Sequence, residues 1–157
     1  MFSERFKIVR VQTVVAANAF TMSDYLSMKN VKHATFVISH AGATDTDLTV
    51  GLDEATAVAA GTHRSVTAVF PILVDIDHGT TSDTLVREAA DAATYKIDPA
   101  TMGSAIVVFE WDPAKHTEGY DCIAVRGSGG DASDTVVVFA ILEMKYQQAS
   151  LPSCIID

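Results

Sequence analysis

Two aspartates and a histidine stand together in the segment VDIDHG and have side chains that can ligate a cation. Asp75 and Asp77 would project from the same face of a strand, and His78 follows directly. A zinc site, however, needs three or four nitrogen or sulfur ligands, and the remaining histidines and cysteines show no metal-type spacing. We therefore interpret the segment as a solvated strand end and turn, and we expect no metal site.

Two other stretches have the composition of ion-binding or phosphate-binding loops. Asp45 and Asp47 alternate in ATDTDLT, but the turn glycine and distant glutamate of a calcium loop do not follow in register. The stretch RGSGGD lacks the G-K-[ST] ending of a phosphate-binding loop and precedes a strand-like segment. We predict a polar loop before a strand in the first case and a flexible hairpin loop over 127–133 in the second.

The residues give no pattern for nucleophilic catalysis. Ser128 lies in GSGG rather than in a G-x-S-x-G turn, and Cys122 lies in an alternating apolar segment that favours burial. Trp111 and Tyr120 flank one loop, and two aromatic residues make a weak platform for a sugar. We expect no catalytic residue, no cofactor and no enzyme activity.

The elements that would position these residues are mostly strands. In DLTVGLD, Leu48, Val50 and Leu52 alternate with Thr49 and Gly51, as in a strand with one face inward. Similar β-branched or aromatic segments cover 33–40, 66–76, 105–111, 121–126 and 135–144. The spacing of these segments predicts seven to nine strands.

Two apolar runs, Ile106–Phe109 and Val136–Leu142, lack this alternation. Alternation disappears where neither face of a strand meets water, so both runs predict central strands covered on both faces. Pro71 interrupts the segment 66–76 and predicts a bulge, an edge or a break, because proline cannot donate to a strand ladder.

Helical signals are short. Ser23 can cap a brief helix over Asp24–Lys29, and the alanine-rich segments 54–60 and 86–93 could each form two turns, the latter equally well a strand and loop. Many short strands with few helices predict a mainly β fold: a single-domain β-sandwich over residues 1–157, jelly-roll-like, with one or two short helices.

The charge balance limits the possible partners. With 20 acidic and 11 basic residues the formal net charge is −9, which repels nucleic acid and anionic membranes. Neither the apolar stretches nor the N-terminal segment predicts a spanning helix or a signal peptide. We expect no nucleic-acid or membrane partner, and two buried, reduced cysteines, Cys122 and Cys154.

Three segments, taken in order, resemble a family of small structural proteins, the auxiliary head proteins that decorate tailed-bacteriophage capsids. They are MSDYLSMKNVKHATFVI at 22–38, LDEATAVAAG at 52–61, and the stretch from Ile106 to Asp157 with EWDPAKHTEGYDCIAV and AILEMKYQQASLPSCIID. The last stretch departs from the family pattern, because LEMKY stands where L-T-D-x-R-Y is usual. The resemblance covers well over half of the chain.

This resemblance implies a β-sandwich or jelly-roll-like fold, a place on the virion and no enzymatic activity. We expect a capsid decoration or cement protein, made in the host cytoplasm, that binds the major capsid protein on the capsid surface, stabilises the head and self-associates as a homo-oligomer. A head–tail neck or tail protein, a carbohydrate-binding β-sandwich module on the virion, and a hydrolase with dispersed carboxylates are the alternatives.

The C-terminal segment 147–157 is a candidate interaction arm that would lie along neighbouring subunits. Its apolar residues, with the preceding tyrosine, are Tyr146, Leu151, Pro152, Ile155 and Ile156. A tail packed on its own domain is the alternative.

Overall fold

The computed structural model describes residues 2–42, 44–147 and 150–155. In chain order the elements are α1 (Phe2–Arg5), β1 (Phe6–Ala16), η1 (Ala17–Ala19), β2 (Leu26–Ser27), β3 (Val31–Ala41), β4 (Leu48–Ala57), β5 (Ala60–Ser65), β6 (Ile72–Asp75), β7 (Val86–Arg87), β8 (Thr94–Ile97), α2 (Pro99–Met102), β9 (Ala105–Trp111), η2 (Pro113–Lys115), β10 (Cys122–Gly129) and β11 (Thr135–Met144). Within these ranges no helix is long and apolar enough to cross a membrane.

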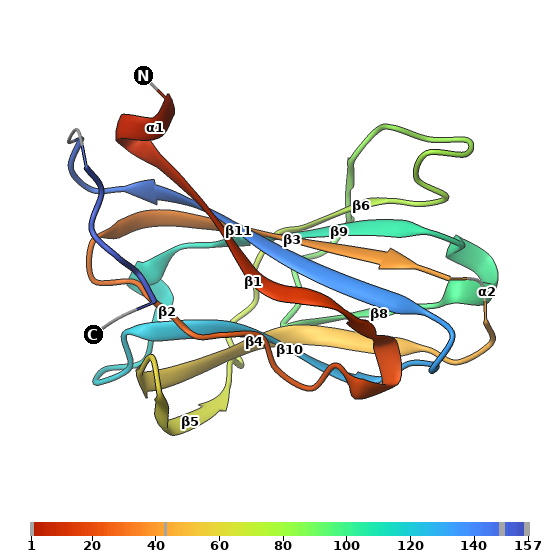
Figure 1. Cartoon of the computed structure of the whole chain (residues 1–157), viewed down its shortest axis with the longest axis horizontal. Coiled ribbons are helices and arrows are strands. Elements are labelled where there is room, and N and C mark those ends of the chain that lie inside the picture. The colour runs from red at the N-terminus through yellow and green to blue at the C-terminus, as the bar shows by residue number, and fades with distance from the viewer. Residues whose placement is uncertain (1, 43, 148–149, 156–157) are drawn as a thin grey trace.

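The strands form two antiparallel sheets that face each other as a single sandwich domain (Figure 1). One sheet has the order β1-β11-β3-β9-β6-β7, and the other has the order β2-β10-β4-β5 with β8 also paired to β4. The pairs β1 with β11, β2 with β10, β3 with β9 and β4 with β8 form one long hairpin rolled over two sheets. This arrangement is a jelly roll, so the predicted fold class is confirmed.

The long connection between β5 and β9 widens both sheets. β6 pairs with β9 and carries β7 on its far side, whereas β8 pairs with β4 in the other sheet. Pro71 directly precedes β6, and the residues before it are not in a strand, so the predicted interruption is a break.

The core lies between the sheets and is rich in aromatic side chains. The rings of Phe70 and Phe109 have centroids 4.9 Å apart, and Phe70 meets Trp111 edge-on at 6.0 Å. These three side chains are fully buried, as are Phe36 and Ile38 on β3. Burial of this apolar surface is the main favourable contribution to folding.

The helical predictions were wrong in detail. Leu26–Ser27, within the predicted helix 24–29, is strand β2, and residues of the predicted helix 54–60 continue β4 and turn into β5. Segment 86–93 begins with strand β7, which was the alternative. The short helices are α1 and α2, neither of which the sequence indicated, and β1 was also missed. Pairing of β2 and β4 with β10 outweighs the local helical preferences of these two segments.

Two strand predictions also need correction. β11 alternates between buried and solvent-facing residues, so its apolar run is not covered on both faces as predicted. The glycine-rich segment is not a hairpin loop, because β10 and β11 belong to different sheets and the chain crosses between them there. Gly129 and Gly130 do adopt the positive φ angles expected of glycine, 86° and 81°.

A pair of phenylalanines tests the assignment of inner and outer faces. Phe109→Ala should lower the free energy of unfolding by about 3–5 kcal/mol, because Phe109 is fully buried in the core. Phe139→Ala on the outer side of β11 is the matched control and should cost less than about 1.5 kcal/mol. Urea unfolding followed by circular dichroism measures both changes, and equal losses would contradict the face assignment.

Candidate functional site

The outer side of the six-stranded sheet carries a continuous row of apolar side chains. Phe139 on β11 lies opposite Val37 on β3, Val37 lies opposite Val108 on β9, and Val108 lies opposite Leu73 on β6. The inward neighbours of these residues, such as Val138, Ile38 and Val107, belong to the core, so the row points away from it.

Further apolar residues flank this row on the same side of the sheet. We define the outer apolar face as Ile8, Val37, Leu73, Ile106, Val108, Val137, Phe139 and Ile141. Ile8 is 60% exposed and Phe139 is 37% exposed, whereas most of the others are half-buried against one another. This contiguous apolar surface is therefore a candidate site of interaction.

Charged residues frame the outer apolar face. Arg10 lies opposite Phe139 at one end of the central row, and Arg87 lies opposite Leu73 at the other. Arg87 also pairs with Asp91 at 2.8 Å. On the adjacent row His33 contacts the carboxylate of Glu110, which also accepts a hydrogen bond from Thr35. The face therefore has an apolar centre and a polar rim, as protein interfaces do.

The outer side of the five-stranded sheet is different, because it carries small or polar residues. Its centre is the buried carboxylate of Asp53, which accepts a hydrogen bond from the Tyr25 hydroxyl at 2.7 Å and contacts His63 Nδ1 at 3.1 Å. Burial, followed by the hydrogen bond to Asp53, raises the pKa of Tyr25. Tyr25 thus remains a protonated donor that satisfies Asp53.

A second polar network closes one end of the sandwich. Glu54 is buried and accepts hydrogen bonds from Arg64 Nε at 2.7 Å and from the Thr117 backbone N–H at 3.0 Å. Burial alone would raise the pKa of Glu54, but these hydrogen bonds and that from His116 outweigh it and lower the pKa. Glu54 therefore stays ionised and internally paired.

Both ring nitrogens of His116 are engaged in this network. Its Nδ1 lies 3.4 Å from Glu54 Oε2, and its Nε2 accepts from Trp111 Nε1 at 3.4 Å. Burial lowers the pKa of His116, although Glu54 and Asp121 oppose the shift. A neutral imidazole with both nitrogens occupied has a structural role here and is not poised as a general base.

A third buried pair, His40 and Asp134, lies at the opposite end of the sandwich. His40 Nε2 is 3.5 Å from Asp134 Oδ2, and the same oxygen accepts a hydrogen bond from Thr44 Oγ1 at 2.7 Å. Gly42 allows this approach, because a Cβ there would lie 1.9 Å from Asp134 Oδ1. Burial lowers the pKa of His40, and Asp134 and the Gly103 backbone only partly oppose the shift.

The residues considered for metal binding do not converge. Asp75 is buried and bonded to His78 Nδ1, whereas Asp77 has a positive φ of 56° and accepts from Thr81 Oγ1 at 2.8 Å. Asp47 pairs with Lys96 at 2.9 Å. Among the described residues no group of three or more histidine, cysteine or acidic side chains could hold a metal ion.

The remaining residues singled out in the sequence are also accounted for by the fold. Cys122 and Cys154 are free thiols and buried, as expected. Trp111 is fully buried, and the Arg64 guanidinium lies 5.0 Å from the centroid of the Tyr120 ring. These two aromatics therefore do not form an open stacking platform for a sugar.

The candidate arm contains residues in two environments. Tyr146 is 70% exposed and Ile155 is 55% exposed, whereas Leu151 packs against the core. The Pro152 carbonyl accepts a hydrogen bond from Lys7 Nζ at 2.7 Å, and the Cys154 carbonyl accepts one from the Ser27 N–H. Ile156 lies outside the described residues. The binding of this arm to a partner stays a prediction.

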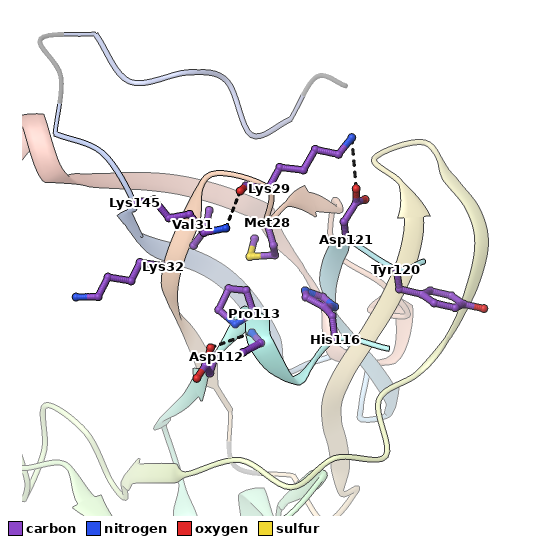
Figure 2. A pocket seen from close by; sticks show the side chains of 11 residues that line it. Met28, Lys29, Val31, Lys32, Asp112, Pro113, His116, Tyr120, Asp121 and Lys145 are labelled. Carbon is purple, nitrogen blue, oxygen red and sulfur yellow. Dashed lines mark hydrogen bonds and ion pairs between the residues drawn. The ribbon is translucent and has the colours of Figure 1, made fainter. Parts of the chain in front are cut away.

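A groove of about 390 Å³ lies beside the η2 turn at the end of the sandwich near the N-terminus (Figure 2). Met28, Val31, Pro113 and His116 line its floor, and three lysines and two aspartates surround it: Lys29, Lys32, Lys145, Asp112 and Asp121. Sequence reasoning missed this groove because Pro113 and Lys145 are far along the chain from Lys29 and Lys32. It also missed the outer apolar face, although the uninterrupted run 136–142 was a signal for it.

Comparison with known proteins finds similarity in structure but no match in sequence. No protein-family model matches the chain, and no curated protein matches it. The crystal structure of SPBc2 prophage-derived protein YomS is similar with a TM-score of 0.49 and 6% sequence identity, over 87% of this chain and 91% of that chain. A likeness at this level does not transfer a function to the chain.

The two buried histidines predict how stability depends on pH. Because the folded protein lowers the pKa of His40 and His116, the unfolded chain binds more protons below about pH 6.5, and stability should fall from there as pH decreases. Each histidine contributes a slope of at most about 1.4 kcal/mol per pH unit. His40→Gln should make the decline between pH 6.5 and 5 shallower in urea unfolding series, with the exposed His63→Gln as control. An unchanged slope would contradict the buried, neutral state of His40.

Proposed function

We propose that this protein is a virion structural protein, a capsid decoration protein that binds the assembled major capsid lattice and stabilises the head. The observation that carries the proposal is the outer apolar face on the six-stranded sheet. The resemblance of three ordered segments to auxiliary head proteins supports the choice of partner. No catalytic step is part of the proposal.

The apolar run on β11 supports docking on physical grounds. A run without alternation is typical of a strand covered on both sides, yet among the described residues Phe139 is exposed and Val137 and Ile141 are only half-buried on the outer side of β11. A partner that covers Phe139, Ile141 and Val137 would remove further apolar surface from water. The favourable free energy of this burial is about 25 cal/mol per Å². A partner surface that completes this cover is therefore favoured.

The size of the outer apolar face favours an interaction repeated over many copies. The outer apolar face spans five strands about 4.8 Å apart, with about five residues of each, so its area is roughly 400 Å². A standard stable interface buries about 800 Å² per partner, so this contact alone would be weak. Weak contacts gain strength when an oligomer binds several sites of a symmetric lattice, which is how a decoration protein acts.

The charges at the ends of the central row favour a lattice protein over a second copy at this face. A two-fold axis in the plane of the sheet, along the strands or across them, would bring arginine onto arginine, because Arg10 and Arg87 stand at opposite ends of one row. An apolar patch flanked by carboxylates complements the row instead. Self-association, which we also propose, would use another surface.

The test of this proposal is binding to purified capsids that lack the protein. Phe139→Glu should reduce the occupancy of capsids at least about tenfold at a fixed protein concentration, because it places a charge in the centre of the docking face. Thr62→Glu on the exposed strand β5 of the other sheet is the control with the same change of charge, and it should bind normally. Cosedimentation with quantitative gel analysis measures the occupancy.

The copy number on particles decides between locations on the virion. Hundreds of copies relative to the major capsid protein would support decoration, whereas six or twelve copies would support a neck component and contradict the capsid assignment. Normal binding by Phe139→Glu would exclude the outer apolar face as the contact.

The candidate arm can be tested without damaging the core. The double variant Tyr146→Ser with Ile155→Ser changes only exposed side chains and should weaken capsid binding while thermal stability stays unchanged. Leu151→Ser should instead lower stability, because Leu151 packs against the core. If the double variant occupied capsids like the unmodified protein, these two side chains would have no part in docking.

A further inference from the structure

The negative charge of the protein is concentrated at one end of the sandwich. Register pairs such as Ala41 with Thr135, Asp75 with Ile106, and Leu48 with Gly129 place several strand ends and loops together there. The aspartates at this end are Asp45, Asp47, Asp75, Asp77, Asp83, Asp98, Asp131 and Asp134, and Lys96 lies among them. In Figure 1 this is the end that carries α2.

The opposite end holds most of the basic residues. They are Arg5, Lys7, Lys29, Lys32, Arg64, Lys115 and Lys145, and they lie among the loops and strand ends near both termini. The groove beside η2 opens at this end, with Lys29, Lys32 and Lys145 on its rim. Acidic residues lie at this end as well, among them Glu4, Glu54, Glu110, Asp112, Glu118, Asp121 and Glu143, so its charges nearly balance, whereas the end near α2 is strongly negative. An acidic partner is therefore repelled by the end near α2 and turned toward this one.

We propose that this groove binds an extended acidic segment of the partner protein, with an apolar side chain on the floor and carboxylates against the lysines. The inference rests on the proposed function for the identity of the partner, and it names the chemistry of the contact. It concerns a surface distinct from the outer apolar face.

The floor of the groove suits an apolar side chain. Met28 and Val31 are buried, and Pro113 adds a rigid apolar wall. His116 is neutral in this environment, since burial lowers its pKa and its nitrogens are occupied by Glu54 and Trp111. An apolar side chain on the floor of the groove would therefore not remove a charged group from water.

The existing ion pairs of the rim leave it able to attract further carboxylates. Lys29 pairs with Asp121 at 3.3 Å and Lys32 pairs with Glu143 at 3.1 Å, but both lysines are well exposed, so water and salt weaken each pair. Glu143 also accepts a hydrogen bond from the guanidinium group of Arg5, so Arg5 and Lys32 share one carboxylate. Lys145 Nζ donates to the Lys29 carbonyl at 2.9 Å, and an ammonium group has three donors.

The directions of the lysines favour an extended segment over a single small anion. In Figure 2 the Lys29 ammonium reaches toward Asp121 and the Lys32 ammonium points away from it, with Lys145 between them. Donors that diverge in this way do not converge on one phosphate, as a phosphate site requires. They match carboxylates spaced along a peptide.

The experiment uses the whole protein and a defined probe. The ¹⁵N-labelled protein is titrated with the blocked hexapeptide Glu-Leu-Glu-Leu-Glu-Leu, and amide shifts are followed by NMR. We expect saturable shifts in 28–32, 112–121 and 144–146, with binding that weakens at higher salt. Lys145→Glu should raise the Kd about fivefold or more. Lys96→Glu, the same substitution at the acidic end, should leave the Kd within about twofold.

Several outcomes would overturn the inference. They are the absence of saturable shifts, shifts located elsewhere, equal binding of Lys-Leu-Lys-Leu-Lys-Leu, and the same shifts with inorganic phosphate alone. Phe139→Glu separates this site from the proposed function, because it should abolish capsid occupancy while peptide binding persists. If peptide binding held but the unmodified protein did not bind capsids, the proposed function would fail and the groove would stand.

Discussion

The pairing of β11 between β1 and β3 is the constraint on which the rest of the structure depends. Since side chains alternate along a strand, this register sends Val136, Val138, Ala140 and Leu142 into the core and sends the intervening residues outward. A shift of the register by one residue would exchange the two sets. The core and the outer apolar face are therefore two consequences of one pairing, and neither can change without the other.

The buried polar groups complete this scaffold. Asp53 and Glu54 lie within β4 and Asp134 directly precedes β11, and each of these buried carboxylates accepts a hydrogen bond from within the chain. Groups satisfied in this way fix loops and strand ends in place. The surfaces that we propose for recognition, the outer apolar face and the groove beside η2, lie outside these buried networks.

The sequence predicted what depends on local pattern, and it failed where distant residues decide. Alternation in 48–52 and the β-branched residues of 105–111 and 135–144 located β4, β9 and β11, and turn-rich spacing indicated the sandwich. Local pattern could not reveal that β1 would pair along β11, or that Leu26–Ser27 would join β10, because both pairings join segments far apart in the chain. The groove was unpredictable for the same reason, since Lys29, Pro113 and Lys145 come from three separate turns. For the run 136–142 the prediction of a strand covered on both sides was wrong, because an apolar run does not show whether its second side is covered, and the outer residues of β11 are exposed or half-buried.

Separation of charge along the sandwich gives these two surfaces a common orientation. With most of the aspartates at the end near α2 and the groove at the other, the field of the protein turns an approaching acidic surface toward the groove before contact. The outer apolar face runs between these ends on one side of the body, so a partner that engages the groove lies close to the face as well. Two weak contacts on one rigid body bind together more strongly than either alone, because the second forms without a further loss of translational freedom. That geometry suits a protein placed many times, in one orientation, on a repeating surface.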